Sequence, residues 1–203
     1  MAKAKAEPKA TREVILDAAL LTLKEQGFAR TSARAIARAG EFNQALIFYH
    51  FGSVNELLLA ALDRIGEERL ARYRAAVEEA KTFEELVAVA ARIYREDLEQ
   101  GHMTVVAEMI AGSVADPKLR PEMMTRTQVW VDFVEEVAAR ALEGSPFAGM
   151  LHARDVAFAL VAFYCGVNIF TRLEEDHSRT EALFDMAARA APLLQPMFPG
   201  GLA

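Results

Sequence analysis

The sequence predicts an all-α protein of about nine helices, with a small three-helix domain followed by a larger helical domain. Three observations support this fold class. Apolar residues recur at helical spacing, good helix formers such as Ala, Leu, Glu and Arg are frequent, and no segment alternates apolar and polar residues as a half-buried strand would. Hydrophobic residues make up 53% of the 203 residues, which suits a packed core and excludes a disordered chain.

The first domain is expected at residues 1–53 and contains three helices. Thr11 is expected to cap a helix over residues 11–26. Thr31 or Ser32 is expected to cap a second helix that ends near Ala39, and a third helix is expected to begin after Asn43 and to end at about Phe51. Both are short, so their stability must come from packing against the first helix.

The second and third helices flank a tight turn. Gly40 is expected to take a positive φ angle in this turn, and Asn43 to cap the helix that follows. A short helix that its neighbour holds rigidly fits the major groove of DNA. Sequence-specific DNA binding by a helix-turn-helix is therefore the leading functional hypothesis.

Residues 54–203 are expected to form the larger domain. Ser53 should cap a long fourth helix, with Glu56 completing a capping box. Because this helix begins beside the third one and continues into the larger domain, it is the expected mechanical link between them. Further helices are expected at about 83–99, 103–112, 118–143, 153–173 and 179–196, separated by Gly, Pro and polar segments.

Charge is divided unevenly along the chain. Residues 1–53 carry eight Lys or Arg and five Asp or Glu, a net charge of +3. Residues 54–203 carry fifteen and twenty-four, a net charge of −9. The basic excess therefore coincides with the helix-turn-helix, as attraction to phosphate requires.

Two features bear on the compartment. Cys165 is the only cysteine, which excludes an internal disulfide and fits a reducing cytoplasm. Residues 1–10 are basic, but the apolar segment of a signal peptide does not follow them. These residues suit either a solubilising tail or a basic arm that contacts phosphate or the minor groove. The cytoplasm is the expected location.

Several short motifs between Thr11 and Leu62 resemble a known family. They are Thr-Arg-Glu-Val-Ile-Leu-Asp-Ala-Ala-Leu at 11–20, Gly27-Phe28, Thr31-Ser32, Ile36-Ala37, Phe48-Tyr49-His50-Phe51, Ser53 and Glu56-Leu57-Leu58. Together they resemble the N-terminal domain of the TetR-type bacterial transcriptional regulators, over about a quarter of the chain. The resemblance implies a homodimer, most often a repressor that a small ligand releases from DNA.

The chain departs from the family pattern at three positions. The family usually has Gly where Glu41 stands, Tyr where Phe48 stands and Lys where Val54 stands. The resemblance implies that this Tyr and this Lys contact phosphates, which supply much of the affinity for DNA. The departures therefore allow an alternative, a helical dimer that binds a small apolar molecule with weakened or lost DNA binding.

The expected DNA contacts lie on the second and third helices. Asn43 and Gln44 can pair with adenine, and Leu46 can meet a thymine methyl group. Tyr49 and capped backbone amides can hold phosphates, while His50 better suits a hydrogen bond near the fourth helix. The full set is Ser32, Arg34, Asn43, Gln44, Ala45, Leu46, Phe48, Tyr49 and His50. Two such helices in a dimer predict an inverted-repeat operator, with half-sites about one helical turn apart.

The larger domain is rich in soft and aromatic side chains that can line a pocket for an apolar effector. The candidates are Tyr94, His102, Met103, Met109, Met124, Thr127, Gln128, Trp130, Phe163 and Asn168. At helical spacing most such residues belong to an ordinary core. Asn168 interrupts an apolar helix, so it either contacts a ligand or bonds across a dimer interface.

The helix at 153–173 predicts self-association. Every residue from Val156 to Val167 is apolar or Gly, a run that is too short for a membrane span. One side can face the core, and the other needs a partner. Together with the last helix it is expected to form a four-helix bundle with a second copy, through Phe158, Val161, Cys165, Leu183, Phe184, Ala187 and Leu194.

No catalytic pattern emerges. The four histidines, at 50, 102, 152 and 177, lack metal-ligand spacing, and neither a phosphate-binding glycine loop nor a nucleophile elbow is present. We therefore expect no enzyme activity, metal or cofactor. A further alternative is a DNA-binding protein whose core is fully packed and accepts no effector.

Overall fold

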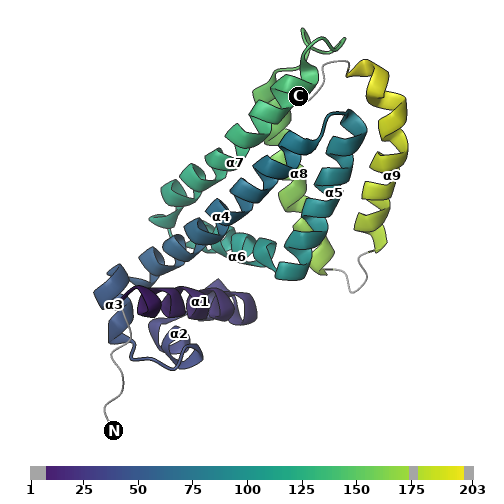
Figure 1. Ribbon diagram of the computed structural model, residues 1–203. Coiled ribbons are helices and arrows are strands. Elements are labelled where there is room, and N and C mark those ends of the chain that lie inside the picture. Colours follow the sequence, from purple (N-terminus) through teal and green to yellow (C-terminus); the bar gives the residue numbers. More distant parts are fainter. Residues whose placement is uncertain (1–7, 174–177, 199–203) are drawn as a thin grey trace. The chain divides into compact units, whose positions relative to one another are not determined.

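The computed structural model describes residues 8–173 and 178–198, and within them every regular element is helical (Figure 1). The all-α prediction is confirmed. The first elements are α1 (Pro8–Gln26), the 3-10 helix η1 (Phe28–Arg30), α2 (Ala33–Ala39), α3 (Ala45–Phe51) and α4 (Val54–Glu79). They are followed by α5 (Phe83–Gln100), α6 (His102–Ala115), α7 (Leu119–Leu142), α8 (Ala153–Leu173), α9 (Ser178–Leu194) and η2 (Gln195–Met197).

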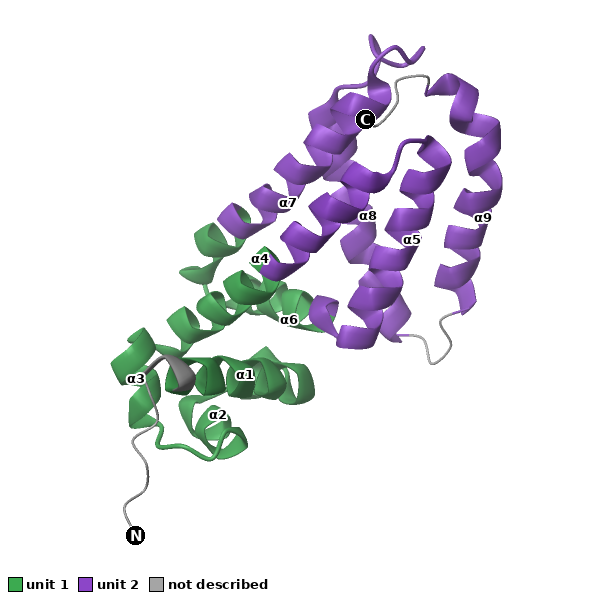
Figure 2. Ribbon diagram, in the orientation of Figure 1, with its two compact units in different colours: residues 1–67, 104–124 green, residues 68–103, 125–203 purple. Residues whose placement is uncertain are grey.

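The described helices form two compact units (Figure 2). Unit 1 consists of residues 1–67 and 104–124, and unit 2 consists of residues 68–103 and 125–203. Unit 1 thus contains α1, the two short helices α2 and α3, the first part of α4, nearly all of α6 and the start of α7. Both α4 and α6 contribute residues to both units.

Helix boundaries follow the sequence signals closely, and the differences outside the helix-turn-helix concern α1 and α6. Helix α1 begins at Pro8 rather than at Thr11, because proline is well tolerated in the first helical turn. Helix α6 continues through Gly112 to Ala115. The side chains of residues 1–10, which include the predicted basic arm, lie outside the description, as do residues 174–177 with His177.

Unit 1 has an apolar core to which α1, α2, α3, α4, α6 and α7 all contribute. Ile15, Ile36, Ile47 and Leu57 are fully buried in it, together with Met109 of α6. On α1 and α4 the core residues recur at helical spacing, as Ile15, Ala19 and Leu23 do on α1, which is why the sequence pattern indicated these helices. This core holds α2 and α3, which are only seven residues each, in place.

Unit 2 is built from the rest of α4 with α5, α7, α8 and α9. Helix α5 begins with a complete capping box between Thr82 and Glu85, and it ends at Gly101, which has a φ of 64°. Tyr73 and Val77 of α4 pack with Phe133 and Val137 of α7 in one apolar cluster. Helix α5 lies against α9.

Candidate functional site

The N-terminus of α2 is set by Ser32, one of the two residues predicted to cap it. The Ser32 Oγ accepts a hydrogen bond from the backbone N–H of Ala35 at 3.2 Å, so it caps the helix. Arg34 follows on the first turn and is exposed. An exposed cation beside a capped helix N-terminus is a suitable arrangement for contacting a phosphate group.

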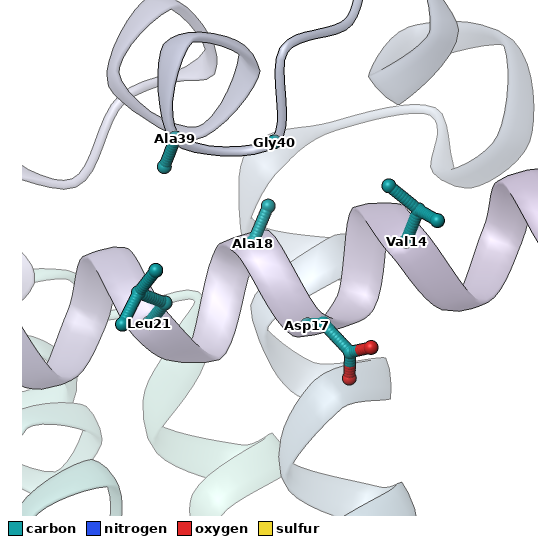
Figure 3. Close-up of a pocket in the computed structure, with 6 residues that line it drawn as sticks. All are labelled: Val14, Asp17, Ala18, Leu21, Ala39 and Gly40. Carbon is teal, nitrogen blue, oxygen red and sulfur yellow. The ribbon is translucent and has the colours of Figure 1, made fainter.

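The turn between α2 and α3 differs from the prediction. Gly40 has a φ of −94°, and Glu41 takes the positive φ instead, at 54°. Glycine at position 40 serves close approach: a Cβ there would lie 2.4 Å from the Phe42 ring and 2.8 Å from the Cβ of Ala18. Figure 3 shows the Ala18 side chain of α1 pointing toward Gly40. The expectation of a positive φ at Gly40 was therefore wrong by one residue.

Helix α3 begins at Ala45, one residue later than predicted. The Asn43 Oδ1 accepts a hydrogen bond from the N–H of Ala45 at 2.9 Å, and Gln44 occupies the residue before the helix. Asn43 thus satisfies the first free amide of α3, although from one position further upstream than a standard cap.

One face of α3 is open to solvent. We define the exposed face of α3 as Gln44, Ala45, Phe48 and Tyr49, which are all exposed. Phe48 is 51% exposed and Tyr49 is 82% exposed. The other three residues follow Gln44 by one, four and five positions, so the four side chains lie on one side of the helix.

The opposite face of α3 is held in unit 1. Ile47 is buried, while Leu46 and Phe51 are half-buried and pack against the core. Leu46 therefore anchors α3 to the core of unit 1, although the sequence suggested that it contacts a base. His50 is half-buried, and its ring lies edge-on to those of Tyr49 and Phe51.

A stripe of α6 holds the chain that leads into α2. Glu108 accepts a hydrogen bond from the backbone N–H of Phe28 at 2.8 Å. One turn later, a Cβ on Gly112 would lie 2.6 Å from the Phe28 ring. After the end of α6, Asp116 accepts a hydrogen bond from the Asn55 side chain at 2.9 Å. Helix α6 thus helps to fix where the helix-turn-helix begins and where α4 begins.

A shallow hollow lies between α1 and the end of α2 (Figure 3). It is lined by Val14, Asp17, Ala18, Leu21, Ala39 and Gly40. It is open to solvent and contains none of the residues predicted to form an effector pocket. Because all six residues belong to unit 1, the hollow is not the effector pocket that the sequence predicted.

Unit 2 contains a buried polar cluster that the sequence analysis did not identify. We call it the Asp97 cluster; it comprises Arg69, Tyr73, Asp97, His102 and Tyr164. The Asp97 carboxylate is fully buried and accepts hydrogen bonds from Arg69 and from the hydroxyls of both tyrosines. Nδ1 of His102 lies 3.4 Å from the same carboxylate.

The cluster keeps its acid and its base charged. Burial alone would raise the pKa of Asp97, but hydrogen bonds from His102 and the tyrosines and the Arg69 charge outweigh it and lower the pKa to about 2. Burial, and then the neighbouring Asp97 charge, raises the pKa of Tyr164. Asp97 is therefore ionised at neutral pH and is compensated by the guanidinium of Arg69.

Several predicted pocket residues adjoin this cluster. The Arg69 guanidinium lies 4.9 Å from the centre of the Trp130 ring and donates to the Met103 sulfur at 3.5 Å. The buried Tyr94 donates to Thr171 at 3.0 Å, and its ring lies edge-on to Tyr164. Tyr94, His102, Met103 and Trp130 are thus brought together in unit 2.

The remaining predicted pocket residues lie elsewhere. Met109 is in the core of unit 1, and Met124 is exposed there. The Gln128 side chain donates to Asp132 at 2.6 Å, and Asn168 donates to the backbone oxygen of Tyr164 at 2.8 Å. Asn168 therefore bonds within its own helix. The last two, Thr127 and Phe163, are half-buried and exposed respectively.

Helix α8 and helix α9 expose large apolar side chains. The most exposed of them are Phe158, Phe163, Phe170, Leu173, Met186 and Leu193, each between 56% and 78% exposed. Among the predicted dimer residues, Phe158 and Leu183 are exposed, whereas Val161, Cys165, Phe184, Ala187 and Leu194 are half-buried. Exposed apolar side chains in such number are typical of an interaction surface.

Helix α8 as a whole is longer than the apolar run used in the sequence analysis. Its 21 residues are enough, by length and composition, to cross a membrane, and 22% of its apolar window is buried. Core helices of proteins outside membranes satisfy the same criterion. No group of His, Cys, Asp and Glu that could hold a metal ion occurs in the described residues.

Comparison with known proteins assigns the helix-turn-helix. Residues 15–61, from the middle of α1 into α4, match the family described as bacterial regulatory proteins, tetR family. Over this stretch the chain carries the DNA-binding domain of the TetR family. Members of this family are DNA-binding transcriptional regulators, and so is this chain.

Relatives of similar length share the whole TetR-family architecture. The HTH-type transcriptional regulator UidR of Escherichia coli K12 is 23% identical over 91% of this chain and 92% of its own. The fatty acid degradation regulator FadR of Bacillus halodurans superposes with a TM-score of 0.74 at 17% identity, over 93% and 96% of the two chains. The multidrug binding protein EbrR, solved with malachite green, gives a TM-score of 0.62 at 25% identity, over 89% and 98%.

Proposed function

We propose that this TetR-family regulator is a homodimeric repressor in the cytoplasm, which binds an inverted-repeat operator and leaves it when a small, largely apolar molecule binds unit 2. The observation that carries the proposal is the exposed face of α3, held from behind by the core of unit 1. A rigid helix with free side chains on one side is what insertion into the major groove requires.

The proposed DNA contacts follow the arrangement of unit 1. Gln44 is proposed to pair with a base, and Tyr49 to reach a phosphate or base edge. Ser32, Arg34 and Asn43 are proposed to meet phosphates beside the two capped helix ends. Retained DNA binding is proposed, because the three departures from the family pattern do not change any of these five contact residues.

A second copy is the proposed cover for the apolar surface of α8 and α9. The six most exposed apolar residues there are large, and three of them are phenylalanines. A twofold interface uses the same surface on both copies, so one apolar face satisfies both partners. The resulting dimer would carry two α3 helices, which explains the proposed inverted repeat.

Unit 2 is the proposed effector region. The soft and aromatic residues around the Asp97 cluster, Tyr94, Met103 and Trp130, suit an apolar molecule. EbrR, the similar protein solved with malachite green, is named for binding drugs, which supports a small-molecule effector here. Because α4 and α6 contribute to both units, a ligand that prefers one arrangement of these helices can change operator affinity.

The proposal is tested by selecting DNA from a random duplex pool with the purified protein at about 0.1 M salt, where electrostatic binding remains measurable. We expect one inverted-repeat motif, whose enrichment is lost in Gln44→Ala. Arg95→Ala, at a charged residue of unit 2, is the control and should enrich the same motif. A folded, dimeric sample that enriches nothing would contradict the proposal and favour the alternative without DNA binding.

A further inference from the structure

The exposed face of α3 is half apolar. Of its four residues, Gln44 and Tyr49 carry polar groups, whereas Ala45 and Phe48 offer only carbon atoms. Phe48 leaves 51% of its side chain in water. Exposing a large aromatic surface is unfavourable, so a partner surface that covers it adds to binding.

The surroundings of this face point to DNA as the occupant. Arg34 and Arg38 are exposed on α2, and residues 1–53 carry a net charge of +3. A phosphate-rich surface is therefore attracted to the helix-turn-helix that exposes Phe48. Within the major groove, the one apolar group on the base edges is the 5-methyl group of thymine, which Ala and Phe contact in known complexes.

We propose that Phe48, together with Ala45, reads thymine methyl groups in each operator half-site. This inference rests on the proposed function and specifies the base chemistry that α3 recognises. Leu46 cannot take this role, because it packs against the core of unit 1. Phe48 lacks a hydroxyl group, so it cannot donate the hydrogen bond to phosphate that the usual tyrosine supplies.

Ala45 and Phe48 are spaced by three residues and therefore lie one helical turn apart. Gln44 precedes Ala45, so its amide reaches a base edge next to the one that Ala45 meets. Since Gln pairs with adenine and the apolar pair meets thymine, the inference predicts that A·T pairs dominate the contacted steps of each half-site.

The test replaces each thymine of the selected operator in turn by deoxyuridine, which removes only the methyl group. With wild-type protein, one or two replacements per half-site should weaken binding by about fourfold each, the worth of one buried methyl group. The other replacements should leave affinity unchanged and act as internal controls.

Variants of Phe48 then assign the contact. Phe48→Ala should bind the thymine and deoxyuridine operators equally at the sensitive position, because the ring that distinguishes them is gone. Phe48→Leu, which keeps an apolar group, should retain part of the discrimination. Circular dichroism of each variant checks that α3 remains folded.

Two results would overturn the inference. The first is a Phe48→Ala variant that keeps the full preference for thymine over deoxyuridine. The second is a Phe48→Tyr variant that binds both operators more tightly by the same factor, which would indicate a phosphate contact at this position. A wild-type protein that selects no operator contradicts the proposed function itself, so the two failures are distinguishable.

Discussion

In unit 1 the apolar side chains of α1, α3 and α4 form a buried core, and α3 presents polar groups to solvent. In unit 2, by contrast, a carboxylate and a guanidinium are buried, and phenylalanines of α8 face solvent. The first arrangement is typical of a domain that folds by itself and presents polar groups to a ligand. The second leaves an apolar surface to be covered. Under the proposed function, association of two copies covers the apolar surface of unit 2, and DNA covers the exposed face of α3 in unit 1.

The largest expected effect comes from the apolar surface of α8. The double variant Phe163→Glu with Phe170→Glu should be monomeric by light scattering, because four charges would be buried between two copies. Its operator affinity should fall by about 10²–10⁴-fold, since binding to two linked half-sites is lost. Met150→Glu, at a residue that is 76% exposed outside α8 and α9, is the control and should remain dimeric. A double variant that stays dimeric would show that the apolar surface of α8 does not hold the two copies together.

The next effect tests the Asp97 cluster. Asp97→Asn leaves the Arg69 charge buried without its partner, which should lower the free energy of unfolding by about 3–5 kcal/mol at neutral pH. Glu136→Gln breaks the exposed pair with Arg74 and should cost below about 1 kcal/mol. Urea unfolding at one fixed protein concentration measures both. Equal losses of unfolding free energy in the two variants would show that the buried pair of Asp97 and Arg69 stabilises the fold no more than the exposed pair of Glu136 and Arg74.

The same cluster predicts a pH dependence. The pKa of Asp97 is lowered from 3.8 to about 2 in the folded state, so folding favours the ionised form. Its contribution, about 2 kcal/mol, is present above the unfolded pKa and is lost as pH falls from about 4 to 2. The difference in unfolding free energy between wild type and Asp97→Asn should therefore shrink over this interval. A difference independent of pH would contradict the assigned pKa.

A smaller effect concerns how α6 holds unit 1. Gly112→Ala places a methyl group against the Phe28 ring and should destabilise the protein by about 1–3 kcal/mol. Gly66→Ala, on α4, meets no atom within 4 Å and should stabilise by up to about 1 kcal/mol through helix propensity. Thermal unfolding compares the two. Stabilisation by both alanines would mean that Phe28 is free to move away.

The smallest effect separates strain from charge at Glu41. Glu41→Gly should raise stability by up to about 1 kcal/mol, since glycine takes a positive φ without steric cost. Glu41→Gln keeps the strain and removes the charge, so it should strengthen DNA binding at low salt without changing stability. Operator titrations and thermal unfolding distinguish the two contributions. Equal stability of all three proteins would exclude strain at this position.

Helical spacing of apolar residues predicted the helices of unit 1 and unit 2 because periodicity depends on local sequence. It did not predict the Asp97 cluster. Arg69 and Asp97 are 28 residues apart, and each looks like a solvated charge on its own helix. Only the packing of α4, α5, α6 and α8 makes them neighbours. Of the residues in and around the cluster, His102 and Met103 were predicted to line a pocket, but nothing in the sequence linked them to Asp97.

The turn of the helix-turn-helix shows a second reason why prediction stops short. Glycine has two uses, a positive φ and close approach, and the sequence does not distinguish them. At Gly40 the neighbours Ala18 and Phe42 leave no room for a Cβ, and the positive φ of the turn is found at Glu41. In the same way, Leu46 and Phe48 are both apolar residues of one helix. Only packing decides that the first supports the core and the second remains exposed.

Hydroxyl-radical footprinting on the selected operator tests the central claim most directly, because it reports both contact and symmetry. We predict two protected half-sites related by a twofold axis, on one face of the duplex and about one helical turn apart. Gln44→Ala should remove both protections together. A single protected segment without twofold symmetry, or protection that survives Gln44→Ala, would contradict a dimer that reads DNA through α3.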